Sequence, residues 1–218
     1  MRIVIAGGHG QIALLLEARL SADGHTVQGL LRRPDGADDL VAAGAEPVVF
    51  DLESATAASL AAVVSGADAV VFAAGAGAGS TAERKYTVDL GGSVLLASAA
   101  ELAGVRRFVQ ISSLGAGAPV PAGSDSTWVA YQDAKGKAED DLRRRDLDWT
   151  IIRPGGLVNT PGIGLVHLVP STGGGTIPRI DVANVLAEVL EQNAAVHQTL
   201  ELVSGSTPIL QAVEAWKG

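Results

Sequence analysis

Cysteine is absent from the 218-residue chain, and aromatic residues make up only 4% of it. The absence of cysteine excludes disulfides and thiolate metal ligands, and it fits a cytoplasmic protein. Because aromatic residues are scarce, alanine, valine, leucine and isoleucine must build the core. No apolar run reaches membrane-spanning length without a glycine or a charge, and no signal peptide is visible before the first apolar stretch. We therefore expect a cytoplasmic protein with no membrane partner.

Positively charged residues are also few. The chain has 16 Lys and Arg residues against 24 Asp and Glu residues, which gives a net charge of −8 at pH 7. A nucleic-acid surface needs a basic stripe, so we expect no nucleic-acid partner. His167 and His197 have no partners at metal-ligand spacing, and we predict no metal site. The hydrophobic content of 47% and the chain length indicate one well-buried domain over residues 1–218.

Apolar runs of strand length alternate with amphipathic helical patterns along the chain. Strands are expected over residues 3–6, 26–31, 46–50, 69–73, 108–111, 149–152 and 199–203, and helices over 11–21, 54–64, 87–103 and 134–145. This alternation predicts an α/β fold, a three-layer doubly wound parallel sheet with helices on both faces. Three loops rich in small residues follow strands, at 75–80, 113–127 and 155–178. They should therefore open at one edge of the sheet, where ligands bind.

The most informative stretch lies between the first strand and the first helix. It reads Gly7-Gly8-His9-Gly10-Gln11-Ile12-Ala13, and both Gly8-x-Gly10-x-x-Ala13 and Gly7-x-x-Gly10-x-x-Ala13 fit a dinucleotide fingerprint. One glycine allows the tight turn, another lets backbone amides approach a pyrophosphate, and the helix N-terminus adds partial positive charge. An ordinary strand–helix turn is the alternative interpretation.

The end of the second strand bears on which dinucleotide binds. Proteins that bind NAD carry an acidic residue there, whereas this chain has Arg32-Arg33. Two guanidiniums at the expected place of a 2′-phosphate favour NADP(H), with solvated surface charge as the alternative. Asp51 and Leu52 end the third strand and are expected to flank the adenine. A helix N-cap explains Asp51 equally well.

Further along, Tyr131 and Lys135 have a Tyr-x-x-x-Lys spacing at the start of a predicted helix. One helical turn places both side chains on the same face. A lysine ammonium close to the phenol would lower the tyrosine pKa, which would help Tyr131 act as a general acid or base. Ser113 follows the fifth strand, so its hydroxyl should reach the same edge of the sheet and can bind a substrate oxygen.

Together these segments resemble the short-chain dehydrogenase/reductase family, specifically its small atypical branch of NAD(P)H-binding proteins related to sugar epimerases and NmrA-like proteins. The matching stretches follow the expected order over nearly the whole chain: IAGGHGQIA, GLLRR, VVFDL, DAVVFAAGAG, GVRRFVQISSLGA, YQDAK, LDWTIIRPGGL and PRIDVANVL. The resemblance implies a single Rossmann-fold domain. It also implies an NADP(H)-dependent oxidoreductase acting on a small carbonyl or alcohol, or on a quinone- or flavin-like substrate.

The resemblance also implies roles for individual residues. Ser113, Tyr131 and Lys135 match the catalytic triad, with Asp89 left in a structural role. The residues assigned to the cofactor are Gly7, His9, Gly10, Gln11 and Ile12 at the pyrophosphate, Arg32 and Arg33 at the 2′-phosphate, Asp51 and Leu52 at the adenine, Ala73, Ala74 and Gly75 past the ribose, Lys135 at the nicotinamide ribose, and Pro154 and Gly155 at the carboxamide. Ile111 and Ser112 are also assigned to the cofactor.

Only residues 153–218 remain after the sixth strand, so any substrate pocket should be small or shallow. We expect loops 76–86, 114–130 and 156–178 to form it and a small molecule to bind there. Two other functions stay open. One is an NmrA-like regulator that senses the dinucleotide without turnover, and the other is an epimerase or isomerase that retains its nucleotide. Helices 87–103 and 134–145 could form a homodimer interface or face water.

Overall fold

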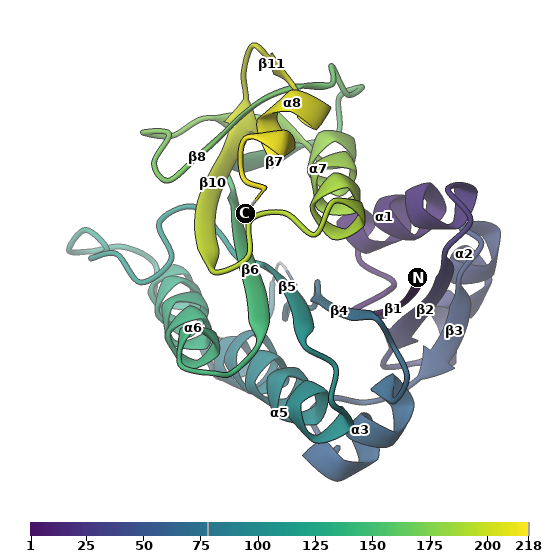
Figure 1. Ribbon diagram of the computed structural model, residues 1–218. Coiled ribbons are helices and arrows are strands. Elements are labelled where there is room, and N and C mark those ends of the chain that lie inside the picture. The colour runs from purple at the N-terminus through teal and green to yellow at the C-terminus, as the bar shows by residue number, and fades with distance from the viewer. Residues whose placement is uncertain (78, 218) are drawn as a thin grey trace.

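The computed structural model describes residues 1–77 and 79–217 (Figure 1). Within them, a nine-stranded sheet has the order β11-β8-β10-β6-β5-β4-β1-β2-β3, and β7 pairs with β9 in a second sheet. The strands are β1 (Arg2–Ala6), β2 (Thr26–Leu31), β3 (Glu46–Val49), β4 (Ala69–Phe72), β5 (Arg107–Ile111), β6 (Asp148–Pro154), β7 (Gly156–Val158), β8 (Leu165–Val169), β9 (Thr176–Pro178), β10 (Gln198–Ser204) and β11 (Thr207–Pro208). The helices are α1 (Gln11–Ala22), α2 (Ala37–Ala42), α3 (Ala57–Val64), α4 (Ala82–Arg84), α5 (Ser93–Ala103), α6 (Ser126–Arg143), α7 (Arg179–Glu191) and α8 (Ile209–Glu214), with the 3-10 helix η1 (Pro34–Gly36) and the π-helix η2 (Lys85–Gly92).

The order of the strands defines the place where a ligand can bind. β1 lies between β2 and β4 and pairs with both in parallel. The chain moves outward from β1 through β2 to β3 and then returns to the other side of β1 with β4. The order therefore reverses between β1 and β4, and ligands of open α/β sheets bind at such a point, outside the carboxyl ends of the strands. The predicted doubly wound Rossmann-like fold is confirmed.

Helices cover both faces of this sheet (Figure 1). Helices α1, α7 and α8 contribute to one core cluster, and α3, α5 and α6 contribute to the other. Along β1, Ile3 and Ile5 belong to the first cluster and Val4 and Ala6 to the second, and all four are fully buried. A strand buried on both faces needs no polar alternation, which explains its continuous apolar sequence.

One edge of the sheet differs from the prediction. Residues 155–178 were expected to be loops, yet they contain β7, β8 and β9. β8 pairs antiparallel with β10 and with β11, so the sheet is mostly but not wholly parallel. Leu165 and His167 are exposed, whereas Val166 and Leu168 are buried. This alternation is too short to stand out among the surrounding glycines and prolines, and pairing with β10 stabilises the strand.

Two predicted helix starts are also wrong, and capping residues explain both. Helix α6 begins at Ser126 because the Asp125 carboxylate accepts hydrogen bonds from the amides of Thr127 and Trp128. Tyr131 therefore lies inside this helix and not at its start. Helix α3 begins after residue 56, where the side chains of Thr56 and Ser59 form a capping box.

Residues 87–103, predicted as one helix, are the end of the π-helix η2 followed by α5. A β-carbon at Gly92 would lie 3.3 Å from Cε2 of Phe72, so the helix approaches β4 closely at this point. The predicted loop 75–80 includes Ala78, which lies outside the described residues. In the part of the chain that the structure describes, no helix combines the length and apolar character needed to cross a membrane.

Candidate functional site

Two cavities of about 420 and 930 Å³ lie at the carboxyl ends of the parallel strands. Both are lined by Ala73, Ala74 and Gly75, the segment that follows β4, so the two cavities adjoin there and are together called the groove. The first cavity, called here the nucleotide cavity, extends towards the ends of β2 and β3. The second, called here the reaction cavity, extends towards the end of β5 and helix α6.

The glycine-rich turn that ends β1 allows very close backbone approach. Gly7 has a φ of 86°, and a β-carbon there would lie 2.6 Å from Cα of Ala74. The Gly8 amide donates to the Leu30 carbonyl at 2.8 Å. Gly10 precedes α1 and offers no side chain to cap it, so the first amides of the helix keep their hydrogen-bonding capacity. This turn fits a diphosphate, because an anion can bind free amides at a helix N-terminus.

Most residues predicted for the cofactor line this groove. They are Gly7, His9, Gly10, Ile12, Arg32, Arg33, Asp51, Leu52, Ala73, Ala74, Gly75, Ile111, Ser112, Lys135, Pro154 and Gly155. Gln11 is the exception, since it is exposed at the first position of α1 and lines neither cavity.

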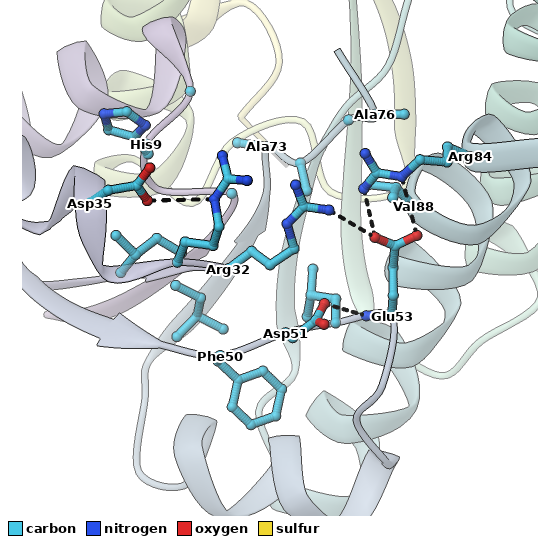
Figure 2. A pocket seen from close by; sticks show the side chains of 18 residues that line it. His9, Arg32, Asp35, Phe50, Asp51, Glu53, Ala73, Ala76, Arg84 and Val88 are labelled. Carbon is cyan, nitrogen blue, oxygen red and sulfur yellow. Dashed lines mark hydrogen bonds and ion pairs between the residues drawn. The ribbon is translucent and has the colours of Figure 1, made fainter. Parts of the chain in front are cut away.

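The nucleotide cavity contains an ion-pair cluster that sequence reasoning missed (Figure 2). Nη2 of Arg84 lies 2.6 Å from Oε2 of Glu53, and Nη1 of Arg32 lies 3.3 Å from the same oxygen. Thr87 donates its hydroxyl to Oε1 of Glu53. The hydrogen bonds from Arg84 and then Thr87 hold the Glu53 pKa below its usual value. Glu53 thus keeps two guanidiniums at one end of the groove.

Arg33 and Asp51 have different surroundings. The Arg33 side chain is 68% exposed and lies 3.6 Å from Asp35, so it is held less firmly than Arg32. Oδ1 of Asp51 accepts a hydrogen bond from the Glu53 amide at 3.0 Å. The alternative that Asp51 caps a helix is therefore wrong, because Thr56 caps α3.

In the reaction cavity, the structure brings together the residues predicted for catalysis. Ser113, Tyr131 and Lys135 all line it, the first after β5 and the other two on α6. Nζ of Lys135 lies 5.9 Å from the centre of the Tyr131 ring and donates to the Ile111 carbonyl at 3.2 Å. The two side chains thus share one face of α6, as their spacing predicts.

Two further residues of this cavity come from η2. Asp89 is 1% exposed, and its carboxylate lies 3.5 Å from Nζ of Lys135 and accepts the Ala76 amide at 3.0 Å. These contacts agree with the structural role expected for Asp89, because they hold Lys135 and the loop after β4 together. Nζ of Lys85 lies 5.5 Å from the centre of the Tyr131 ring. Lys85 has no motif that marks it in the sequence.

Behind the reaction cavity, Ser112 is tied to a buried carboxylate. Its hydroxyl donates to Oε1 of Glu139, a fully buried residue one turn beyond Lys135 on α6. Arg143 and Arg153 bind the other oxygen of Glu139. This network connects β5, α6 and β6 and holds the end of β5 in place beneath the groove.

Behind the glycine turn lies a second buried carboxylate, that of Glu17 on α1. Within the described part of the chain neither of its oxygens has a hydrogen-bond partner, and burial raises the Glu17 pKa to about 8. Oε1 lies so close to Gly8 and Gly29 that a β-carbon at either residue would clash with it. No group of three or more potential metal ligands occurs within residues 1–77 and 79–217.

Comparison with known proteins agrees with this geometry. The sequence profile of the NAD(P)H-binding family matches residues 7–193. A Bacillus subtilis (strain 168) protein named as an uncharacterized sugar epimerase, YhfK, is 33% identical, covering 98% of this chain and 99% of its own. A Bacillus halodurans protein assigned to the NAD-dependent epimerases/dehydratases has a similar solved structure, with a TM-score of 0.90, 34% identity and 99% coverage of both chains.

The Lactococcus lactis oxidoreductase ylbE is also similar in structure, with a TM-score of 0.85 and 27% identity over 99% of this chain and 96% of that one. The similarity to these proteins extends over essentially their full lengths. The glycine turn after β1 lies within the matched region and has the backbone geometry that a dinucleotide requires. The chain belongs to the NAD(P)H-binding family, and its cofactor is a nicotinamide dinucleotide.

Proposed function

We propose that this protein is an NADP(H)-dependent oxidoreductase that exchanges hydride with the carbonyl or alcohol carbon of a small molecule. The observation that carries the proposal is the position of Ser113, Tyr131 and Lys135 in the same groove as the glycine turn. A hydroxyl that follows β5 and a phenol and an ammonium on α6 line one cavity, where they can serve a reacting carbonyl group.

When bound, NADPH would supply the hydride. The Ser113 hydroxyl, at the end of β5, would bind and orient the substrate oxygen. The Tyr131 phenol would donate its proton to that oxygen as the carbonyl carbon receives the hydride, so that an aldehyde or ketone, NADPH and one proton become an alcohol and NADP⁺. Lys135 would hold the nicotinamide ribose, and its ammonium would stabilise negative charge developing on the phenol oxygen. Asp89 keeps Lys135 in position.

The preference for the phosphorylated dinucleotide rests on the cluster at the other end of the groove. Arg32 and Arg84 both face Glu53, and each guanidinium has donors left for a phosphate. Arg33 is exposed beside them and adds positive charge. A 2′-phosphate is the group that two arginines in an acidic protein would bind here.

Replacing Arg32 or Arg84 with alanine is expected to weaken NADPH binding by about 10- to 100-fold, because each change removes a charge-assisted contact to phosphate. Binding of NADH should change by less than about 3-fold, because NADH lacks that phosphate. Isothermal titration calorimetry of both dinucleotides with each variant measures the difference.

Arg144→Ala is the matched control, because this exposed arginine follows the end of α6 and lines neither cavity. An equal loss of affinity for NADPH and NADH in the Arg32 and Arg84 variants would contradict the phosphate assignment.

A nucleotide-retaining epimerase is the second candidate, because the Bacillus subtilis and Bacillus halodurans relatives are named as an epimerase and an epimerase/dehydratase. The two functions differ in what happens to the cofactor. An epimerase restores its nucleotide in each cycle, so purified protein would carry tightly bound NAD(P) and show no net oxidation. An oxidoreductase would consume NADPH in proportion to the carbonyl that it reduces.

A further inference from the structure

Positively charged side chains outnumber negatively charged ones on the walls of the reaction cavity. Its carboxylates are Asp89 and Asp125, and both are already engaged. Asp89 pairs with Lys135 and accepts the Ala76 amide, and Asp125 accepts the first amides of α6. The cations that remain are Lys85 and Arg179, and neither has a carboxylate within 4.0 Å among the described residues.

Lys85 is a buried cation with no carboxylate within 4.0 Å of it among the described residues. The residue is 7% exposed, and its Nζ donates to the Gly77 carbonyl at 2.8 Å and lies over the Tyr131 ring. Both partners are neutral. Taking an ammonium out of water costs free energy that neutral partners offset only in part, so an anionic ligand at this position would be stabilised.

Arg179 adds a second positive charge from another element. It is the first residue of α7, where a cation is disfavoured by the helix dipole, and no side chain caps this helix. Asp181 in the same turn is engaged, since its oxygens accept the amides of Ile163 and Gly164. Nη1 of Arg179 donates to the Asn159 side chain at 2.6 Å, which leaves further guanidinium donors free for an anion.

The other walls of the cavity are apolar and aromatic. The Trp128 and Tyr131 rings lie 5.5 Å apart with a tilt of 32°, and Trp128 is 48% exposed. Ile12, Leu114 and Leu157 line the same space. A flat conjugated molecule can stack against such rings. The cavity of about 930 Å³ also includes Lys135, Pro154 and Gly155, which are assigned to the nicotinamide end of the cofactor, so the substrate would occupy the remaining part of it.

We infer that the substrate is a planar, conjugated carbonyl compound that carries a carboxylate or phosphate group, and that the positive charges of Lys85 and Arg179 on the walls of the cavity attract this anionic group. The carbonyl part of the inference rests on the proposed function. The anion site does not, because it can be measured as binding without turnover.

The test uses three flat probes of one shape, which are 2-naphthoate, 2-naphthyl phosphate and neutral 2-naphthamide. Calorimetric titrations of the protein saturated with NADP⁺ are expected to show that at least one anion binds about 10-fold or more tightly than the amide. The tighter of the two anions identifies carboxylate or phosphate as the substrate group. The titrations are repeated without nucleotide, so that a failure of NADP⁺ to bind does not hide the anion site.

Lys85→Met and Arg179→Gln should each reduce the preference for the anion while leaving naphthamide binding unchanged. Arg179 is only half buried at a helix start, so its variant should fold even if the Lys85 variant does not. Arg144→Gln is the matched control. The inference is overturned if neither anion binds, if the amide binds as tightly as both anions, or if the preference survives in the folded variants.

Turnover of a carbonyl panel is measured on the same samples. Anion preference without any NADPH oxidation would remove the oxidoreductase proposal and leave the anion site. Carbonyl reduction without anion preference would remove the substrate inference alone.

Discussion

Tyr131→Phe is expected to lower kcat by about 10²- to 10⁴-fold, the usual contribution of a positioned general acid or base. The phenylalanine ring keeps the packing against Trp128 and the contacts with the ammonium groups of Lys85 and Lys135, and only the proton donor is lost. Affinity for the dinucleotide should therefore stay close to that of the wild type. Steady-state NADPH oxidation against a carbonyl and quinone or flavin panel measures the loss.

Tyr86→Phe is a matched control, because Tyr86 is the other of the two tyrosines in the chain. Its hydroxyl donates to Asp133, and the residue lines neither cavity. Unchanged turnover in the Tyr131 variant would remove this residue from the mechanism. A dinucleotide-sensing regulator would be favoured by a different result, namely cofactor-dependent binding to a partner with no turnover of any compound in the panel by the wild-type protein.

Glu17→Gln should make the protein more stable at alkaline pH. The Glu17 pKa is raised by burial from 4.5 to about 8, so the folded protein keeps this proton over a range in which the unfolded chain has lost it. Between these values, the unfolding free energy should fall as pH rises, with a slope of about 1.4 kcal/mol per pH unit for one proton. The contribution is fully present below pH 4.5 and is lost as the pH passes about 8.

The glutamine variant has no proton to lose at this site, so this part of its stability should not depend on pH. At pH 5 the variant and the wild type should be similar. Above pH 8 the variant should be the more stable by roughly 3–5 kcal/mol. Urea unfolding at a series of pH values measures both profiles. Glu214→Gln, an exposed change on α8, is the control and should leave the wild-type profile in place. If the unfolding free energies of the wild type and Glu17→Gln change with pH in the same way, Glu17 is already ionised in the folded protein and the expectation is wrong.

The sequence predicted the strands of the parallel part of the sheet well. β1, β2, β3, β4, β5, β6 and β10 lie within about two residues of the apolar runs that indicate them. Helix starts were less accurate. For α6, the cap Asp125 lies nine positions before the expected start at residue 134, in a segment that was interpreted as loop because it is rich in small residues.

In the candidate site, the residues marked by local sequence features were predicted, and the contacts between distant segments were not. Tyr131 and Lys135 were predicted from their spacing, and Ser113 from its position after a strand. Both features can be read directly from the sequence. Glu53 and Arg84 were not predicted, because they are 31 positions apart and meet only when β3 and the loop after β4 reach the same edge of the sheet. The pairing of Asp89 with Lys135 joins η2 to α6 in the same way.

The sequence by itself determined the alternation of strands and helices and the glycine turn after β1. These are local properties, since burial on both faces requires continuous apolar residues and a φ of 86° at Gly7 favours glycine. The tertiary structure alone decided which charges are neutralised. A carboxylate is engaged or free according to groups that approach from distant parts of the chain, and the free positive charge of Lys85 and Arg179 becomes visible only after that pairing is known.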